Sequence, residues 1–130
     1  MARAYTIATA ALTLEMPAKW LDNTLSHIKI RGVRQEKQGV ARHITIDGLL
    51  ILSITALLIV ELGISLSRAA RMAETLANNN GLYTSPGGVG IQLDLEALGS
   101  KLLERLEHAV EVAPIPKRGR PPKNKTGRLY

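Results

Sequence analysis

Apolar residues recur at intervals of three and four along most of the chain, which is the spacing of one side of an α-helix. This pattern predicts five helices, at residues 6–14, 17–27, 45–62, 66–77 and 95–112. Residues 30–44 and 82–93 instead contain strand-like pieces around polar or glycine-rich turns, which predicts two β-hairpins. The expected fold class is therefore mainly α with two small β-hairpins, followed by a basic tail.

Local signals mark where these helices begin and end. Residues suited to capping a helix start are Thr6, Thr45 or Asp47, Ser65 and Asp94. Gly63 suits the left-handed stop that ends the long middle helix. In the last helix one apolar side is expected to hold Leu95, Leu98, Leu102, Leu106 and Val110, with Leu103 beside them.

The middle helix contains an uncharged run from Gly48 to Val60. A membrane-spanning helix needs about 20 apolar residues, so this shorter run indicates a buried helix. The run is apolar on nearly every face, and a domain of about 110 residues has few elements with which to cover it. We therefore expect a homodimer built mainly on residues 48–62 and 95–112.

Charge is distributed unevenly over the 130 residues, whose net charge is +6. Residues 1–46 hold seven basic and three acidic residues, and residues 47–112 hold four basic and eight acidic. Residues 113–130 hold six basic residues and no acidic one. Two separate basic regions suggest two contacts with one polyanion.

Composition excludes several functions. The chain has no cysteine, and aromatic residues make up 3% of it, so thiolate chemistry and base-stacking on single strands are not expected. The histidines, which lie too far apart for metal-ligand spacing, are His27, His43 and His108. No nucleophile or convergent acid pair is visible, so we expect no enzyme, no metal, no cofactor and no small-molecule effector.

The first two predicted helices form a helix-turn-helix candidate, and the first hairpin forms a candidate wing. Major-groove contact is expected from Lys19, Asn23, Ser26 and His27, and phosphate or minor-groove contact from Arg31, Arg34, Lys37 and Arg42. The alternatives are a solvated helix face and a solvated hairpin. Arg42 has a further alternative, since it could brace a carboxylate inside the domain, and Trp20 is expected in the core.

The basic tail contains an Arg-Gly-Arg-Pro sequence flanked by lysines, and its composition predicts disorder without a ligand. Glycine allows close approach to a narrow groove, proline keeps the strand extended, and arginine favours A·T-rich minor grooves. This pattern resembles an AT-hook. The residues expected to contact DNA are Lys117, Arg118, Gly119, Arg120, Pro121 and Lys123. A solvated basic tail and a nuclear-import-like cluster are the alternatives.

Residues 5–77 resemble the DNA-binding domain of the MerR-type winged helix-turn-helix regulators, in particular the small excisionase-like branch. The resemblance rests on the order of the elements, on the Ala41-Arg42-His43-Ile44-Thr45 end of the wing, and on Glu61-Leu62-Gly63-Ile64-Ser65. It implies a winged helix-turn-helix fold and double-stranded DNA as the partner. The chain departs from the family at Asp22, Asn23 and Thr24, where the family usually places arginine and aromatic residues.

These patterns together predict a sequence-specific transcriptional regulator in the cytoplasm, associated with the nucleoid. No signal peptide precedes Tyr5, and no membrane contact is expected. The expected units are a DNA-binding domain at 1–77, a dimerisation hairpin and helix at 78–112, and the tail at 113–130. Two alternatives stay open, namely an architectural nucleoid-type protein with A·T bias and an antitoxin-like protein-interaction module.

Overall fold

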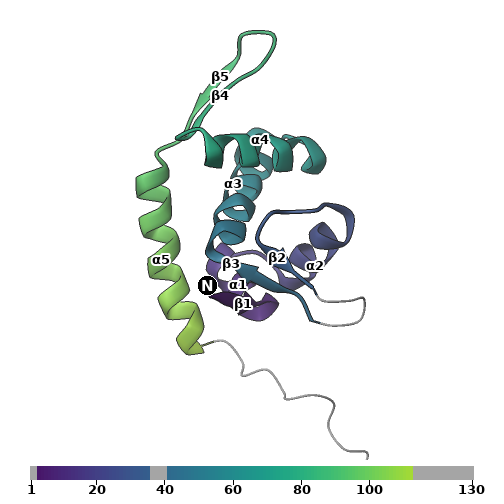
Figure 1. Cartoon of the computed structure of the whole chain (residues 1–130), viewed down its shortest axis with the longest axis vertical. Helices are drawn as coiled ribbons and strands as arrows, with labels where there is room; N and C mark the ends of the chain where they lie inside the picture. Colours follow the sequence, from purple (N-terminus) through teal and green to yellow (C-terminus); the bar gives the residue numbers. More distant parts are fainter. Residues whose placement is uncertain (1–2, 36–40, 113–130) are drawn as a thin grey trace, which may run out of the picture.

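The structure, a computed structural model, describes residues 3–35 and 41–112 (Figure 1). The helices are α1 (Ile7–Leu14), α2 (Ala18–His27), α3 (Ile46–Leu62), α4 (Leu66–Asn78) and α5 (Leu95–Val112). The strands are β1 (Ala4–Thr6), β2 (Val33–Arg34), β3 (His43–Thr45), β4 (Leu82–Thr84) and β5 (Gly90–Gln92). The prediction of a mainly α fold is confirmed, and the two predicted hairpins lie in two small antiparallel sheets.

Most of the predicted capping residues stand at helix ends and form the expected hydrogen bonds. The side chains of Thr6, Thr45 and Asp94 each accept a hydrogen bond from the backbone N–H three residues later, at 3.2, 3.3 and 3.0 Å. Gly63 ends α3 with φ of 67°, in the left-handed region. Ser65 occupies the cap position of α4, but its side chain forms no capping hydrogen bond there.

The first hairpin belongs to a three-stranded antiparallel sheet in the order β1-β3-β2. Ile44 in the central strand pairs with Tyr5 of β1 and with Val33 of β2, and it is fully buried. The pairing of β2 with β3 confirms the predicted hairpin, whose tip at residues 36–40 lies outside the described residues. The sequence pattern did not predict β1, which closes the other edge of β3.

Helix α3 runs through the middle of the molecule and is covered by α1, α4 and α5 (Figure 1). It is buried at most positions from Gly48 to Leu58, while Val60 and Leu62 at its end are 69% and 58% exposed. The expectation that one chain lacks the elements to cover this helix is therefore wrong. Most of residues 48–62 are unavailable to a second copy, because the chain's own helices already bury them.

Helix α5 lies alongside the body and packs mainly against α1, with further contacts to α3 (Figure 1). Its buried side is formed by Leu102, Leu106 and Ala109. Val110 was expected on that side but is 43% exposed, because Ala109 occupies the inward position of this turn. Among the described helices, none combines the length and apolar character that crossing a membrane requires.

Candidate nucleic-acid interface

Helix α2 is set against α1 by a short turn. Glu15 adopts the left-handed conformation, with φ of 57°, and the Met16 N–H donates to the Ala11 carbonyl at 3.1 Å. Pro17 then begins α2 from an extended conformation. Leu21, which is fully buried, fixes the inner side of the helix. The turn therefore determines which side of α2 meets solvent.

The outward side of α2 carries the polar residues that the sequence singled out. Lys19, Asn23, Ser26 and His27 are all exposed. The Ser26 hydroxyl donates to the Asp22 carbonyl at 2.8 Å, and Nδ1 of His27 lies 2.7 Å from the Asn23 carbonyl. These two side chains are thus turned back onto their own helix, and each keeps a second polar function free, namely the hydroxyl lone pairs and Nε2.

The side chains of Lys19 and Asn23 differ from those of Ser26 and His27 because they are not turned back onto the helix. Within the described part of the chain, neither forms a side-chain hydrogen bond or an ion pair. The Asn23 amide offers both a donor and an acceptor in one plane, which is the geometry that reads adenine in the major groove. Asn23 is therefore the strongest base-reading candidate, and Lys19 is a candidate for phosphate contact.

Arg42 connects the base of the β2–β3 hairpin to α2. Its Nη1 lies 3.9 Å from Oδ1 of Asp22, and its side chain is 23% exposed against 56% for Asp22. The alternative that Arg42 braces a carboxylate of the domain agrees with this geometry. The pair also places a positive charge beside Asp22, which would otherwise repel phosphate.

Arg31, just before β2, and Arg34, within β2, are both exposed. Gly32 lies between the two arginines in the sequence; its φ is 90°, and its carbonyl accepts from the Thr45 N–H at 2.8 Å. A Cβ on Gly32 would lie 2.6 Å from the backbone N of Gly48, so glycine permits the close approach of this segment to α3. This close contact sets the position of the backbone that carries the two arginines relative to α3.

The other predicted site residues lie outside the part of the chain that the structure describes. They are Lys37 and the six residues of the AT-hook-like sequence, namely Lys117, Arg118, Gly119, Arg120, Pro121 and Lys123.

The structure adds two cations that the sequence analysis did not assign to the site. Lys29 and Arg71 line the same shallow pocket of about 350 Å³ as His27, at the end of α2. Arg71 comes from α4, far along the sequence, so no local pattern could place it beside α2. Glu74 lines the same pocket and partly offsets this positive charge.

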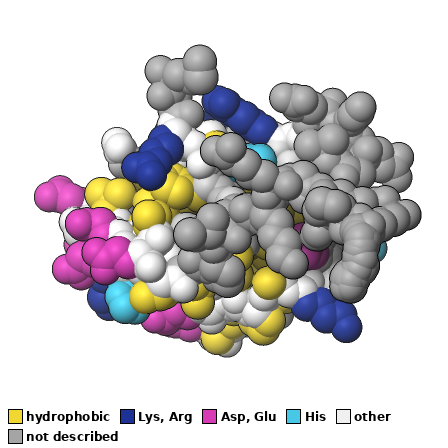
Figure 2. Space-filling view, turned by 90° about the horizontal axis from the view of Figure 1, so that it is seen from below, with side chains coloured by type: hydrophobic (Ala, Val, Ile, Leu, Met, Phe, Trp, Pro, Cys, Tyr) yellow, Lys and Arg dark blue, Asp and Glu magenta, His cyan; other side chains and the backbone are white. Residues whose placement is uncertain are grey.

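Figure 2 shows how charge is spread over the face seen from below Figure 1. Outside the area drawn in grey, Lys and Arg side chains are visible at several separate places on this face, whereas most of the visible acidic side chains gather at one side. The guanidinium of Arg3 lies 5.3 Å from the centre of the Tyr5 ring, a cation–π distance, next to the sheet.

In residues 3–35 and 41–112, no group of three or more His, Asp or Glu side chains could hold a metal ion.

Comparison of the chain with protein-family models, with curated proteins and with solved structures finds no match.

Proposed function

We propose that this protein binds double-stranded DNA as a sequence-specific transcriptional regulator, through a winged helix-turn-helix formed by β1 to α4. The observation that carries the proposal is the outward side of α2, where the side chains of Lys19 and Asn23 are exposed and form no hydrogen bond or ion pair within the described chain. Lys19 and Asn23 stand four positions apart, so they lie on the same side of the helix. A helix that offers an amide and a cation on one side suits the major groove.

The wing supports this proposal through its connection to the same helix. The Arg42–Asp22 contact, a weak and partly exposed ion pair, joins the base of the hairpin to α2. In the proposed complex Arg42 is a positioning residue, whereas Arg31 and Arg34 contact phosphates. Lys29 and Arg71 would extend the phosphate contacts beyond the end of α2.

The tail would add a second contact to the same DNA. A hook tethered to a bound domain meets its groove at a high effective concentration, so two weak contacts combine into tight binding. The expected binding mode is thus a specific major-groove contact with an A·T-biased contact beside it. A homodimer would present two copies of α2 to half-sites about one helical turn apart.

The test is a base-by-base binding profile on a site selected from random duplexes. Asn23→Ala should cost about 1–3 kcal/mol on that site and relax the preference at one base position. Arg34→Ala should weaken all sequences about equally, because a phosphate contact carries no sequence information. Asn78→Ala is the matched control, since Asn78 is an exposed asparagine at the end of α4.

An equal loss on all sequences from Asn23→Ala would show that α2 does not read bases. That result would favour the architectural alternative, in which the protein binds DNA without strong sequence preference. One observation favours this alternative. The side chains of Ser26 and His27 interact with backbone carbonyls of their own helix, which leaves fewer side chains of α2 free to contact bases. Binding profiles with no preferred site would decide for it.

The contribution of the tail is measured separately. Deletion of residues 114–130 should lower affinity and flatten the salt dependence, since each phosphate contact contributes a slope of roughly −0.9 in log K against log salt. Arg120→Ala in the full chain should remove much of the preference for A·T tracts. A truncated protein that keeps both its affinity and its slope would disprove the role of the hook.

A further inference from the structure

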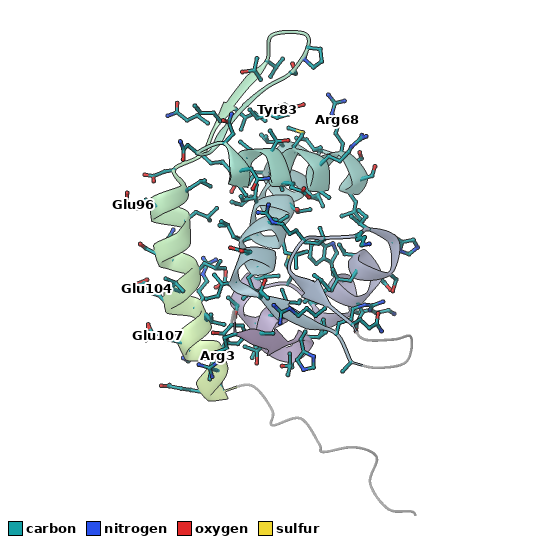
Figure 3. The ribbon with its side chains drawn as sticks, in the orientation of Figure 1. Arg3, Arg68, Tyr83, Glu96, Glu104 and Glu107 are labelled. Carbon is teal, nitrogen blue, oxygen red and sulfur yellow. The ribbon has the colours of Figure 1, made fainter. Side chains whose placement is uncertain are left out.

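A groove runs between α4 and the β4–β5 hairpin. Its volume is about 640 Å³, and its apolar walls include Leu62, Met72 and Val89. Leu62 and Val89 are 58% and 64% exposed, although both are large aliphatic residues. Arg68 and Tyr83 also line the groove, and both are labelled in Figure 3, beside each other next to α4.

The groove is cationic in a part of the chain that is otherwise acidic. Residues 47–112 hold eight acidic and four basic residues. Two of the four basic ones, Arg68 and Arg71, line this groove or the smaller hollow of about 330 Å³ next to it. None of the eight acidic residues lines either of them. Within the described chain Arg68 forms no ion pair, so its charge is open to a partner.

The outer face of α5 has the opposite character. At helical spacing it presents Glu96, Leu103, Glu104, Glu107, Val110 and Glu111. Leu103 and Val110 are 48% and 43% exposed and stand two turns apart, so they form an apolar stripe between the carboxylates. The cations of this helix, Lys101 and Arg105, project from its other side, where they line a different pocket.

Within one chain these two surfaces point in different directions. In Figure 3 the labelled side chains of Glu96, Glu104 and Glu107 extend away from the body, while Arg68 and Tyr83 lie on the other side of the hairpin. A chain therefore does not fill its own groove with its own α5. A second copy of the chain brings an acidic and apolar helix that matches the groove in both charge and surface.

We propose that two copies pair through this groove, with the outer face of α5 of each copy seated between α4 and the β4–β5 hairpin of the other. Leu103 and Val110 would cover the apolar walls, and Glu104 and Glu107 would face Arg68. Such reciprocal contacts are the form that a two-fold dimer takes. Direct pairing of the two α5 outer faces would instead place carboxylates against carboxylates, which is unfavourable.

Charge reversal tests this arrangement by sedimentation equilibrium at micromolar concentration, without DNA, so the result is independent of the proposed function. The wild-type protein should have about twice the mass of the 14.1 kDa chain. Arg68→Glu alone, and Glu104→Arg with Glu107→Arg, should each raise the dissociation constant of the dimer at least about tenfold. An equal mixture of these two proteins should restore dimers, because every groove then meets a helix of opposite charge. All three substitutions in one chain should restore them too.

Two controls carry the same changes in charge away from both surfaces. Glu74→Arg on α4 and Lys101→Glu on α5 should leave the dimer mass unchanged, and circular dichroism should show that every variant is folded. A monomeric wild-type protein would overturn the proposal, and so would species larger than a dimer. It would also fail if Arg68→Glu had no effect while the α5 substitutions changed the mass, since that result indicates α5–α5 pairing.

Discussion

The two hairpins of this protein are alike in length but differ in what holds them. The β2–β3 hairpin lies within a three-stranded sheet, and in β3 both Ile44 and Thr45 are buried, at 0% and 5% exposed. The β4–β5 hairpin stands alone and projects beyond α4 (Figure 1), and none of its strand residues is buried. One hairpin is part of the core, and the other is an appendage to it.

This difference shows that strand pairing alone does not define the role of a hairpin. An isolated two-stranded hairpin is at best marginally stable in water, so other contacts must hold the second one. Tyr83 and Ile91 supply them, since both pack against the core while partly exposed. Their exposure on the projecting hairpin, beside Val89, is what a surface that meets a partner requires.

The two hairpins should differ most in the stability that is lost when a glycine of each is replaced by alanine. Gly32 and Gly88 have nearly equal φ values, 90° and 91°, but a Cβ on Gly32 would clash with Thr45 and Gly48, whereas Gly88 has nothing within 4 Å. Gly32→Ala should destabilise the protein by about 3–5 kcal/mol, from strain plus overpacking, and Gly88→Ala by about 1–2 kcal/mol, from strain alone. Urea unfolding measures both. Equal losses would show that the contact with α3 is not tight.

A smaller difference in stability cost is expected when the central isoleucine of each hairpin is replaced by alanine. Ile44→Ala removes a fully buried side chain and should cost about 3 kcal/mol. Ile91 is only partly buried, so Ile91→Ala should cost about 1 kcal/mol in the monomer. Thermal unfolding at low protein concentration compares the two. A cost for Ile91→Ala as large as that for Ile44→Ala would mean that the second hairpin belongs to the core.

The smallest effect concerns the ion pair that ties the first hairpin to α2. Asp22→Asn removes the partner of Arg42 from a pair that is 3.9 Å long and largely exposed on the aspartate side. Such pairs contribute about 0–1 kcal/mol, and salt screens them. The stability difference from wild type should therefore shrink between low and high salt in chemical unfolding. A loss above about 2 kcal/mol would mark Arg42 as a core contact.

The parts of the fold that could be predicted from the sequence are those with local causes. Thr6, Thr45 and Asp94 cap helices through backbone groups three residues away, and Gly63 stops α3 by its own conformation. Strand β1 could not be predicted, because its three residues pair with β3, some forty positions later. The cover of α3 also depends on how distant helices pack, which periodicity does not reveal.

The candidate site divides in the same way. The exposure of Lys19 and Asn23 follows from helical periodicity, so the sequence could anticipate it. The Arg42–Asp22 contact and the position of Arg71 beside His27 depend on tertiary packing. From the sequence Arg42 had three interpretations, namely DNA contact, a solvated hairpin and a brace for a carboxylate, and only the folded chain shows Asp22 next to it.

The contact of α5 with α1 has a consequence for synthesis. The first helix of the chain is covered by the last helix that the structure describes. A ribosome releases α1, α2 and the β2–β3 hairpin well before residues 95–112, so the side of α1 that α5 covers stays uncovered until α5 has been synthesised. A nascent chain that ends at residue 77 would expose the side of α1 that α5 buries. The part of the fold to which the proposed DNA contacts belong would thus gain the stabilising contact between α1 and α5 only after residues 95–112 have been synthesised.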